Sequence, residues 1–154
     1  MRFYLEPSVL VKAFKLEENS DKIIDIINLF ERKEGWYGFT SKWSLLEVAR
    51  ALRKDGKPEE LISLNLDELR RHEIVFASVS DEMLEESKDI VTPYDVYASD
   101  ALHVATFRFL ERKERLDGFL CDDRHYHQLR KTVSVLKLNE IQLPQKFKRI
   151  LTAK

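Results

Sequence analysis

The sequence of 154 residues has little of several features that define whole classes of proteins. A single cysteine, Cys121, excludes an internal disulfide framework and any cysteine-rich zinc module. No apolar run approaches the ~20 residues that a membrane-spanning helix needs, because charged residues interrupt every candidate. The N-terminus lacks the basic, apolar and small-residue regions of a signal peptide. We therefore expect a soluble, cytoplasmic protein that makes no contact with a membrane.

Several motifs of common phosphate-handling proteins are also missing. No G-x-x-x-x-G-K-[ST] and no G-x-G-x-x-G occurs, which leaves a P-loop or a dinucleotide site without support. A haloacid-dehalogenase-like phosphatase would explain a late pair of aspartates, but it needs D-x-D after its first strand, where this chain has Glu6-Pro7-Ser8. A receiver domain needs an early acidic pair and a mid-chain phosphorylatable aspartate, and neither is visible.

The composition that is present is that of a folded protein. Hydrophobic residues make up 44% and charged residues 34% of the chain, which is a foldable balance. Only four glycines and four prolines occur, so we expect few long loops. The length fits one domain spanning residues 1–154.

The net charge of −1 hides an uneven distribution of charge. Residues 124–154 carry eight lysines and arginines against one acid, Glu140, so this segment is basic and the rest of the chain is acidic. Blocks of opposite sign permit a basic surface for a polyanion beside an acidic site. A solvated basic tail explains the same charges equally well.

Short apolar runs alternate with helical patterns along the whole chain. The runs predict strands at Arg2–Leu5, Trp36–Thr40, Ile74–Ala77, Phe119–Cys121 and Val133–Leu136. Helical spacing predicts helices from a cap at Ser20 to about Gly35, over Lys42–Lys54 with Gly56 after its end, after Pro58, over Asp81–Ile90, and over Ala98–Lys113. Because parallel strands need long crossovers, this order favours an α/β fold with a parallel sheet between helices.

Acidic residues stand where ligands collect in such folds, beyond the carboxyl ends of the strands. Glu6 follows the first strand, Asp122 and Asp123 follow the fourth, Asp100 opens the longest helix, and Glu47 lies within an apolar helical face. Each acid alone has an ordinary explanation as a helix cap, a first-turn acid or a member of an ion pair. Their combination predicts one acidic site.

Four short motifs carry these acids in a familiar order. They are Ser8-Val9-Leu10-Val11-Lys12, then Thr40-Ser41 with Leu45-Leu46-Glu47-Val48, then Asp100-Ala101-Leu102-His103-Val104-Ala105-Thr106, and finally Asp123-Arg124. In this order the chain resembles the PIN-domain nucleases over essentially its whole length, and most closely the VapC-type toxins of VapBC toxin–antitoxin pairs. The resemblance implies a three-layer α/β/α fold around a central parallel sheet of about five strands.

The same resemblance implies metal-dependent hydrolysis of RNA phosphodiester bonds. Mg²⁺, with Mn²⁺ as a substitute, prefers the oxygen ligands that carboxylates supply. By this resemblance Glu6, Asp100 and Asp123 would be ligands, with Asp122 and Glu47 as further candidates. Glu47 would hold a metal-bound water or position the nucleophile. Ser8 and Ser41 would support the carboxylates through their hydroxyls.

Two departures from the family pattern bear on activity. The first aspartate of the family is Glu6 here, one methylene longer, and the threonine of the last motif is Cys121. The thiol removes a hydroxyl that can orient a carboxylate or a water. These changes leave open a second reading, a PIN-like module that binds RNA or protein with a weakened or inactive site.

The basic segment and the partners follow from the same comparison. Arg124, His125, Arg130 and Lys131 come directly after the last motif, where an RNA backbone would cross. His103 is interpreted as a partly buried structural residue rather than a general base. Trp36, Tyr37 and Trp43 are more typical of core or dimer packing than of base stacking. The family implies a homodimer and a cognate antitoxin, whose arginine would replace the charge of the metal.

Overall fold

The computed structural model describes residues 1–123, 126, 130 and 132–144. Strands and helices alternate along these residues in one order. The elements are β1 (Arg2–Leu5), α1 (Pro7–Val11), η1 (Lys12–Phe14), α2 (Ser20–Glu31), β2 (Tyr37–Ser41), α3 (Trp43–Lys54), α4 (Glu59–Arg71), β3 (Ile74–Ala77), α5 (Asp81–Val91), α6 (Ala98–Glu114), β4 (Gly118–Leu120), β5 (Val135–Leu136) and η3 (Leu138–Glu140).

The five strands form one parallel sheet in the order β3-β2-β1-β4-β5. The central strand β1 has neighbours on both sides, with Tyr4 opposite Phe39 of β2 and Phe119 of β4. Strands β2 and β3 follow one another outward on one side of β1, and β4 and β5 follow one another outward on its other side. The carboxyl ends of β1 and β4 therefore mark the switch point, where doubly wound sheets bind their ligands.

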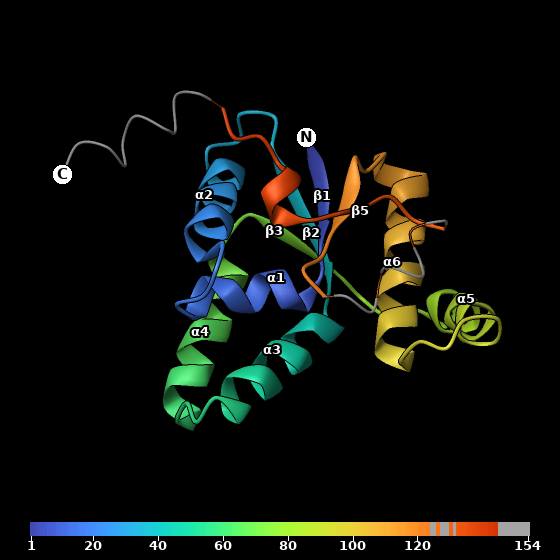
Figure 1. The fold of residues 1–154 in the computed structure, drawn as a ribbon, viewed down its shortest axis with the longest axis horizontal. Coiled ribbons are helices and arrows are strands. Elements are labelled where there is room, and N and C mark those ends of the chain that lie inside the picture. The colour runs from blue at the N-terminus through green and yellow to red at the C-terminus, as the bar shows by residue number, and fades with distance from the viewer. Residues whose placement is uncertain (124–125, 127–129, 131, 145–154) are drawn as a thin grey trace.

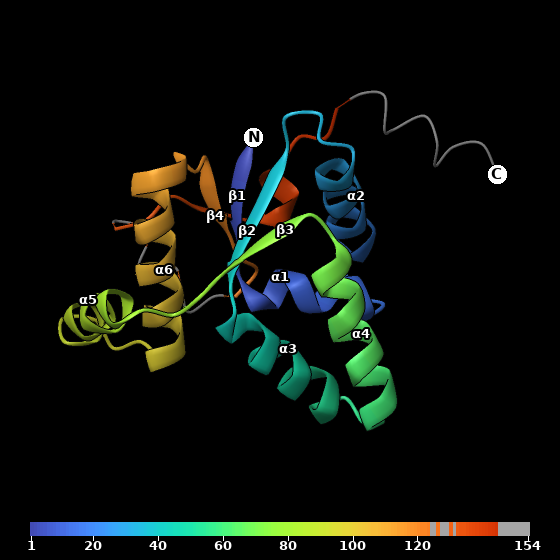
Figure 2. The same ribbon diagram turned by 180° about the vertical axis from the view of Figure 1, so that it is seen from behind.

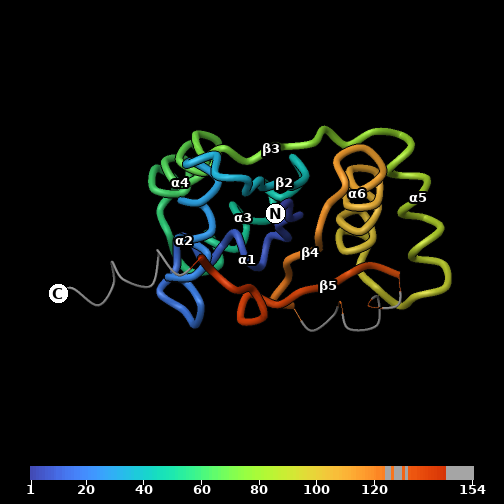
Figure 3. Tube along the Cα trace, turned by 90° about the horizontal axis from the view of Figure 1, so that it is seen from above, coloured from blue at the N-terminus to red at the C-terminus, as the bar shows by residue number. Residues whose placement is uncertain are grey.

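Helices cover both faces of the sheet, giving the three layers that the sequence predicts. Helices α1 to α4 lie on one face, and α5 and α6 lie on the other (Figure 1). The view from above separates the same two groups (Figure 3). Successive strand residues point to opposite faces, so Phe3 and Leu5 of β1 join the core under α1 to α4, whereas Tyr4 joins the core under α6.

The carboxyl edge of the sheet also receives the starts of three helices. Helices α1 and α3 begin directly after β1 and β2, and α6 begins at the same edge and runs back along the sheet (Figure 1). From behind, β3 lies outside β2, and α4 leads into it (Figure 2). Residues of the first turn of α6 are thereby brought beside the ends of β1 and β2.

Most predicted elements are found, with strand ends shifted by one or two residues. The short helix α1 is not among the predictions, because its five residues are too few to show a helical period. Helix α2 begins at Ser20 rather than being capped by it; Asn19 is the cap residue. The Ser20 hydroxyl instead donates to the Lys15 carbonyl at 2.6 Å.

Helix α2 also ends at Glu31, before the predicted end near Gly35, whereas α3 and α5 have common capping residues. Gly56 follows α3 with a φ of +79°, a left-handed conformation that glycine adopts without strain. The Ser80 hydroxyl caps α5 by accepting from the Met83 amide at 3.3 Å. Within the described residues, no helix has both the length and the apolar character to cross a membrane.

Candidate active site

The candidate site is built on the turn that follows the central strand. The Glu6 amide donates to the carbonyl of Leu120 at 3.0 Å, which continues the pairing of β1 with β4 past the end of β1. Glu6 then caps α1: its Oε2 accepts from the Ser8 amide at 2.8 Å and from the Ser8 hydroxyl. The Pro7 ring at the first helical position suits this turn. The local sequence therefore fixes the direction of the Glu6 carboxylate.

The Glu6 carboxylate is buried, with 6% of the residue exposed. Burial raises its pKa from 4.5 to about 7, against the opposing influence of His103 and the hydrogen bonds from Ser8, and the negative charge of Glu47 raises it further. A buried carboxylate with this pKa carries its charge at a substantial free-energy cost at neutral pH. A cation at this position would relieve that cost.

Ser8 joins the two central strands through its side chain. Its hydroxyl donates to Glu6 and accepts from the Asp122 amide at 3.1 Å. The Cys121 sulfur lies 3.9 Å from the same oxygen. Ser8 thus stands between the residues that follow β1 and those that follow β4.

Cys121 takes over part of what a hydroxyl would do. It is buried, and its sulfur accepts from the Asp123 amide at 3.2 Å. Burial, followed by the negative charge of Glu6, raises the pKa of the thiol far above its ordinary value. Cys121 therefore stays protonated and neutral, and it holds the backbone of Asp123 rather than adding a charge to the site.

The two aspartates after β4 differ in their surroundings. Asp122 Oδ2 lies 3.3 Å from the Lys12 ammonium, and both side chains are mostly buried. Lys12 also contacts Glu17 at 3.4 Å and the Glu18 carbonyl at 3.1 Å. Asp122 is therefore neutralised within the protein, whereas the neighbouring Asp123 has its amide held by Cys121.

Asp100 enters the site from the first turn of α6, with 8% of the residue exposed. Its Oδ1 accepts from the Tyr126 hydroxyl at 3.4 Å and from the Ser99 hydroxyl at 3.5 Å. Burial raises the pKa of Tyr126 well above its ordinary value, and the negative charges of Glu6 and then Asp100 raise it further. The phenol therefore remains a donor, and both carboxylates lie within its electrostatic reach.

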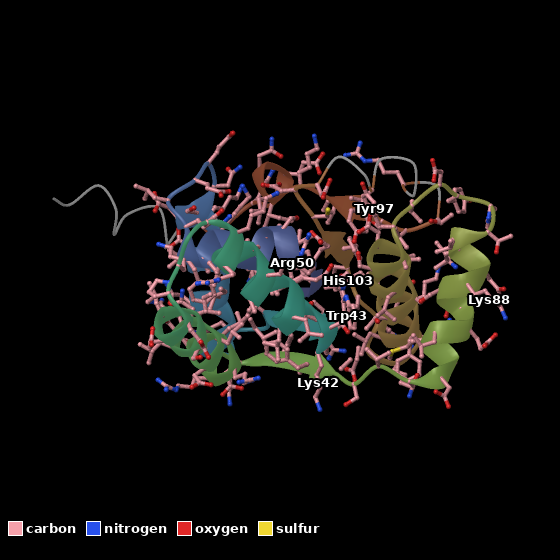
Figure 4. All side chains as sticks on the ribbon, turned by 90° about the horizontal axis from the view of Figure 1, so that it is seen from below. Lys42, Trp43, Arg50, Lys88, Tyr97 and His103 are labelled. Carbon is pink, nitrogen blue, oxygen red and sulfur yellow. The ribbon has the colours of Figure 1, made fainter. Side chains whose placement is uncertain are left out.

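Glu47 reaches the site from α3 and is held by a histidine. Its Oε2 lies 2.5 Å from His103 Nε2, and His103 Nδ1 lies 2.7 Å from the Tyr4 hydroxyl. Figure 4 looks onto the carboxyl edge and shows His103 between α3 and α6. The Ser41 hydroxyl accepts from the Trp43 amide at 3.1 Å at the start of α3. Ser41 thus positions the helix that carries Glu47.

The acids occupy one edge but do not form a finished metal cage. Within residues 1–123, 126, 130 and 132–144, no three histidine, cysteine or acidic side chains are grouped closely enough to hold an ion as placed. The donor set nevertheless suits a hard divalent cation, since the candidate ligands are carboxylate oxygens. Glu6 in particular is a buried carboxylate with no ion pair to a described residue.

The structure describes one of the four residues predicted to contact RNA. Arg130 is exposed. Arg124, His125 and Lys131 lie outside the described residues. The contribution of these residues to RNA binding stays a prediction.

Several site residues were not predicted from the sequence. The Tyr4 hydroxyl contacts His103 Nδ1, the Tyr126 hydroxyl donates to Asp100, and Lys12 neutralises Asp122. Lys12 lies in the first motif, so its place in the motif was a usable signal. Tyr4 could be assigned to one face of the first strand, because it lies two residues before Glu6 and strand side chains alternate between faces. Nothing in the sequence around Tyr126 points to Asp100.

Comparison with known proteins adds a family and a fold. The PIN domain family model matches residues 3–128. No curated protein matches the chain in sequence.

Solved structures with the same fold include three at low sequence identity. The VapBC2 complex of Rickettsia felis, bound to a DNA fragment from its promoter, has a chain similar to this one with a TM-score of 0.65, 13% identity and coverage of 89% of this chain and 98% of that one. VapC20 of Mycobacterium tuberculosis, described as a toxin that cleaves the sarcin–ricin loop, has a TM-score of 0.63 and 11% identity to this chain. The match covers 82% of this chain and 94% of VapC20. A chain of a toxin–antitoxin complex from Klebsiella pneumoniae has a TM-score of 0.57 and 16% identity, and the match covers 90% of this chain and 98% of that one.

Proposed function

The chain belongs to the PIN domain family, and we propose that it is a metal-dependent endoribonuclease that hydrolyses RNA phosphodiester bonds as the toxin of a toxin–antitoxin pair. The observation that carries the proposal is the gathering of acids at the switch point of the sheet. Glu6 and Asp100 are buried there, and both raise the pKa of the same phenol, Tyr126. Burying two carboxylates in one place is costly unless a cation meets them.

Glu6, Asp100 and Asp123 would hold Mg²⁺, or Mn²⁺ in its place. When bound, such an ion makes a water acidic enough to attack phosphorus and neutralises charge on the phosphate. Glu47, held by His103, would orient that water. Asp122 serves the site less directly, because Lys12 already neutralises it.

The test is cleavage of a single-stranded RNA by the full chain, with Mg²⁺ and separately with Mn²⁺. Asp100→Asn removes a charge from the site with almost no change in shape, and Asp89→Asn, on the exposed side of α5, is the matched control. The proposal expects cleavage by wild type and by Asp89→Asn and none by Asp100→Asn. Equal cleavage by all three would refute the assignment of the site.

Metal binding has a readout that does not depend on cleavage. A ligand that binds the folded state better than the unfolded state raises the unfolding temperature. Mg²⁺ or Mn²⁺ should therefore stabilise wild type and leave Asp100→Asn/Asp123→Asn unchanged in differential scanning fluorimetry. Equal stabilisation of both proteins would show that the ion binds elsewhere.

A second candidate function rests on Glu6. The longer side chain and the lack of a grouped three-residue cage among the described residues favour a PIN-like module that binds RNA or protein with a weakened site. RNA binding and metal-dependent stabilisation without cleavage, with cleavage gained in Glu6→Asp, would select this alternative.

The proposal includes two protein partners. In a toxin–antitoxin pair, a cognate antitoxin would place an arginine against the acids of the site, where its charge replaces that of the metal. Co-expression with the product of a neighbouring small gene, followed by co-purification, tests this partner. If no such product co-purifies with the wild-type chain, the result would count against the toxin role.

The second partner is another copy of the chain. Trp43, Leu84 and Val91 line an apolar cavity of about 610 Å³ between the start of α3 and helices α5 and α6, and Tyr97 is exposed nearby. A two-fold contact would cover this surface on both copies at once. Light scattering should give a dimer for wild type and a monomer for Val91→Glu. A monomeric wild type would refute the proposed dimer.

A further inference from the structure

Two hydrogen bonds connect three elements at the acidic site. His103 of α6 is fully buried, with Tyr4 of β1 at one ring nitrogen and Glu47 of α3 at the other. The three residues lie far apart in sequence, because Tyr4 and Glu47 are separated from His103 by 99 and 56 positions. Such a contact does not arise from helix or strand geometry alone.

The Tyr4 end of these hydrogen bonds is held by aromatic packing. Its ring stacks on Phe119 at 5.1 Å between centroids and meets Phe107 edge-on at 6.2 Å. Burial raises the pKa of its hydroxyl well above the ordinary value. Tyr4 therefore keeps its proton, and its packed ring presents the hydroxyl to His103 Nδ1.

The direction of the hydrogen bonds follows from donor and acceptor chemistry. An ionised carboxylate only accepts, so His103 Nε2 must donate to Glu47. In the neutral imidazole the other nitrogen is then an acceptor, and the Tyr4 hydroxyl is the donor that it needs. The contact thus selects the tautomer in which Nε2 carries the proton.

Glu47 is the most exposed member of the three. Its side chain is 28% exposed, and within the described part of the chain its only hydrogen bond is to His103. Without this bond, the rotatable side chain of a helix surface would leave the carboxylate free to turn toward water. One oxygen of Glu47 is fixed by His103, and the other stays available to a ligand.

We propose that His103 is a positioning residue, which Tyr4 orients and which holds the Glu47 carboxylate in place for the proposed nuclease reaction. The inference rests on the proposed function, in which Glu47 orients the attacking water. His103 touches neither RNA nor ion and acts only through Glu47. Losing a supporting hydrogen bond of this kind lowers metal affinity or activity by about 10- to 100-fold.

Two substitutions separate positioning from packing. In His103→Gln the amide nitrogen falls near the place of Nε2 and can still donate to Glu47, whereas the shorter His103→Asn reaches only toward Tyr4. Both remove the ring, so a purely structural role predicts equal losses that follow stability. Positioning predicts that kcat falls about 10- to 100-fold in His103→Asn with KM little changed, and that His103→Gln recovers most of it.

The matched control is Thr106→Val, one turn farther along α6. Thr106 is also fully buried, and its hydroxyl donates to the Leu102 carbonyl at 2.7 Å rather than to a site residue. The control should lose stability without losing kcat in its folded fraction. A loss of kcat in Thr106→Val as large as in His103→Asn would overturn the proposal.

A double-mutant cycle with Glu47→Gln shows whether His103 acts through Glu47. If it does, adding His103→Asn to Glu47→Gln costs no further activity, and the two losses are not additive. Additive losses would overturn the proposal. The same variants are then compared by their affinity for Mn²⁺, measured by calorimetry. His103→Asn should weaken Mn²⁺ binding by about tenfold and His103→Gln by less.

Failure of this inference is distinct from failure of the proposed function. If wild type cleaves no RNA, the nuclease proposal fails, and the imidazole nitrogen spectrum of His103 still reports on positioning. In wild type it should show a proton on Nε2 and none on Nδ1, and in Glu47→Gln a mixture of tautomers. A proton on Nδ1 in wild type would overturn the proposed direction of the hydrogen bonds.

Discussion

Glu6→Gln should make the metal-free protein more stable at neutral and alkaline pH. The wild-type carboxyl has a folded-state pKa of about 7 against 4.5 in the unfolded chain, because burial disfavours its charge. The folded protein therefore binds more protons than the unfolded chain between these values, and stability falls as pH rises through this window. A shift of about 2.5 units corresponds to about 3 kcal/mol.

The neutral amide of Glu6→Gln does not titrate, and its oxygen can still accept from the Ser8 amide. The difference in free energy of unfolding between variant and wild type should be constant below about pH 4 and grow by about 3 kcal/mol by pH 8 to 9. For a chain of this length, such a gain raises the unfolding temperature by about 6–12 °C.

Urea unfolding in the presence of a chelator, at pH values from about 4 to 9, measures this difference directly. Glu60→Gln, an exposed glutamate on α4, is the matched control and should give no pH-dependent difference. Titrating groups that do not interact with Glu6 cancel because they are common to all three proteins. Parallel stability curves for wild type and Glu6→Gln would refute the reasoning. Mg²⁺ should narrow the gap at pH 8, because it binds the ionised carboxylate.

Three further outcomes follow from the site and the core. Charge reversal at Arg124 and Arg130 should weaken RNA binding and flatten its salt dependence by about 0.7 in slope per lost phosphate contact, measured by fluorescence anisotropy; an unchanged slope would mean a solvated surface. Glu6→Asp should keep or raise RNA cleavage in a gel assay, since it restores the reach of the family aspartate, and a loss would mean that the turn is adapted to glutamate. Gly38→Ala should lower stability by about 1–3 kcal/mol in urea titration, because its methyl would lie 2.6 Å from the Phe30 ring.

The order of elements was predictable because burial leaves a period in the sequence. β1 is apolar on both faces, and α6 keeps apolar residues along its length, so both are visible without any knowledge of their neighbours. The candidate acids could be singled out because each lies in a short motif, and all but Glu47 stand near the start or end of an element. These are local patterns, which can be recognised in the sequence without knowledge of the fold.

The contacts between elements were not predictable in the same way. Asp122 was a candidate ligand, but its pairing with Lys12 joins positions 110 residues apart, and no period records such a pair. Tyr4 and His103 likewise come from β1 and α6, and only the sheet order brings them together. His103 was interpreted as partly buried and structural; it is fully buried, and it holds a site residue.

The position of β4 beside β1 has a consequence for synthesis of the chain. Phe3 pairs with Gly118, so the strand made first receives its second neighbour only after more than a hundred further residues have left the ribosome. A nascent or truncated chain that stops before Gly118 exposes one apolar edge of its central strand, which invites proteolysis or aggregation. The same fragment lacks Asp123. An incomplete copy is thereby both short-lived and without its full set of acids.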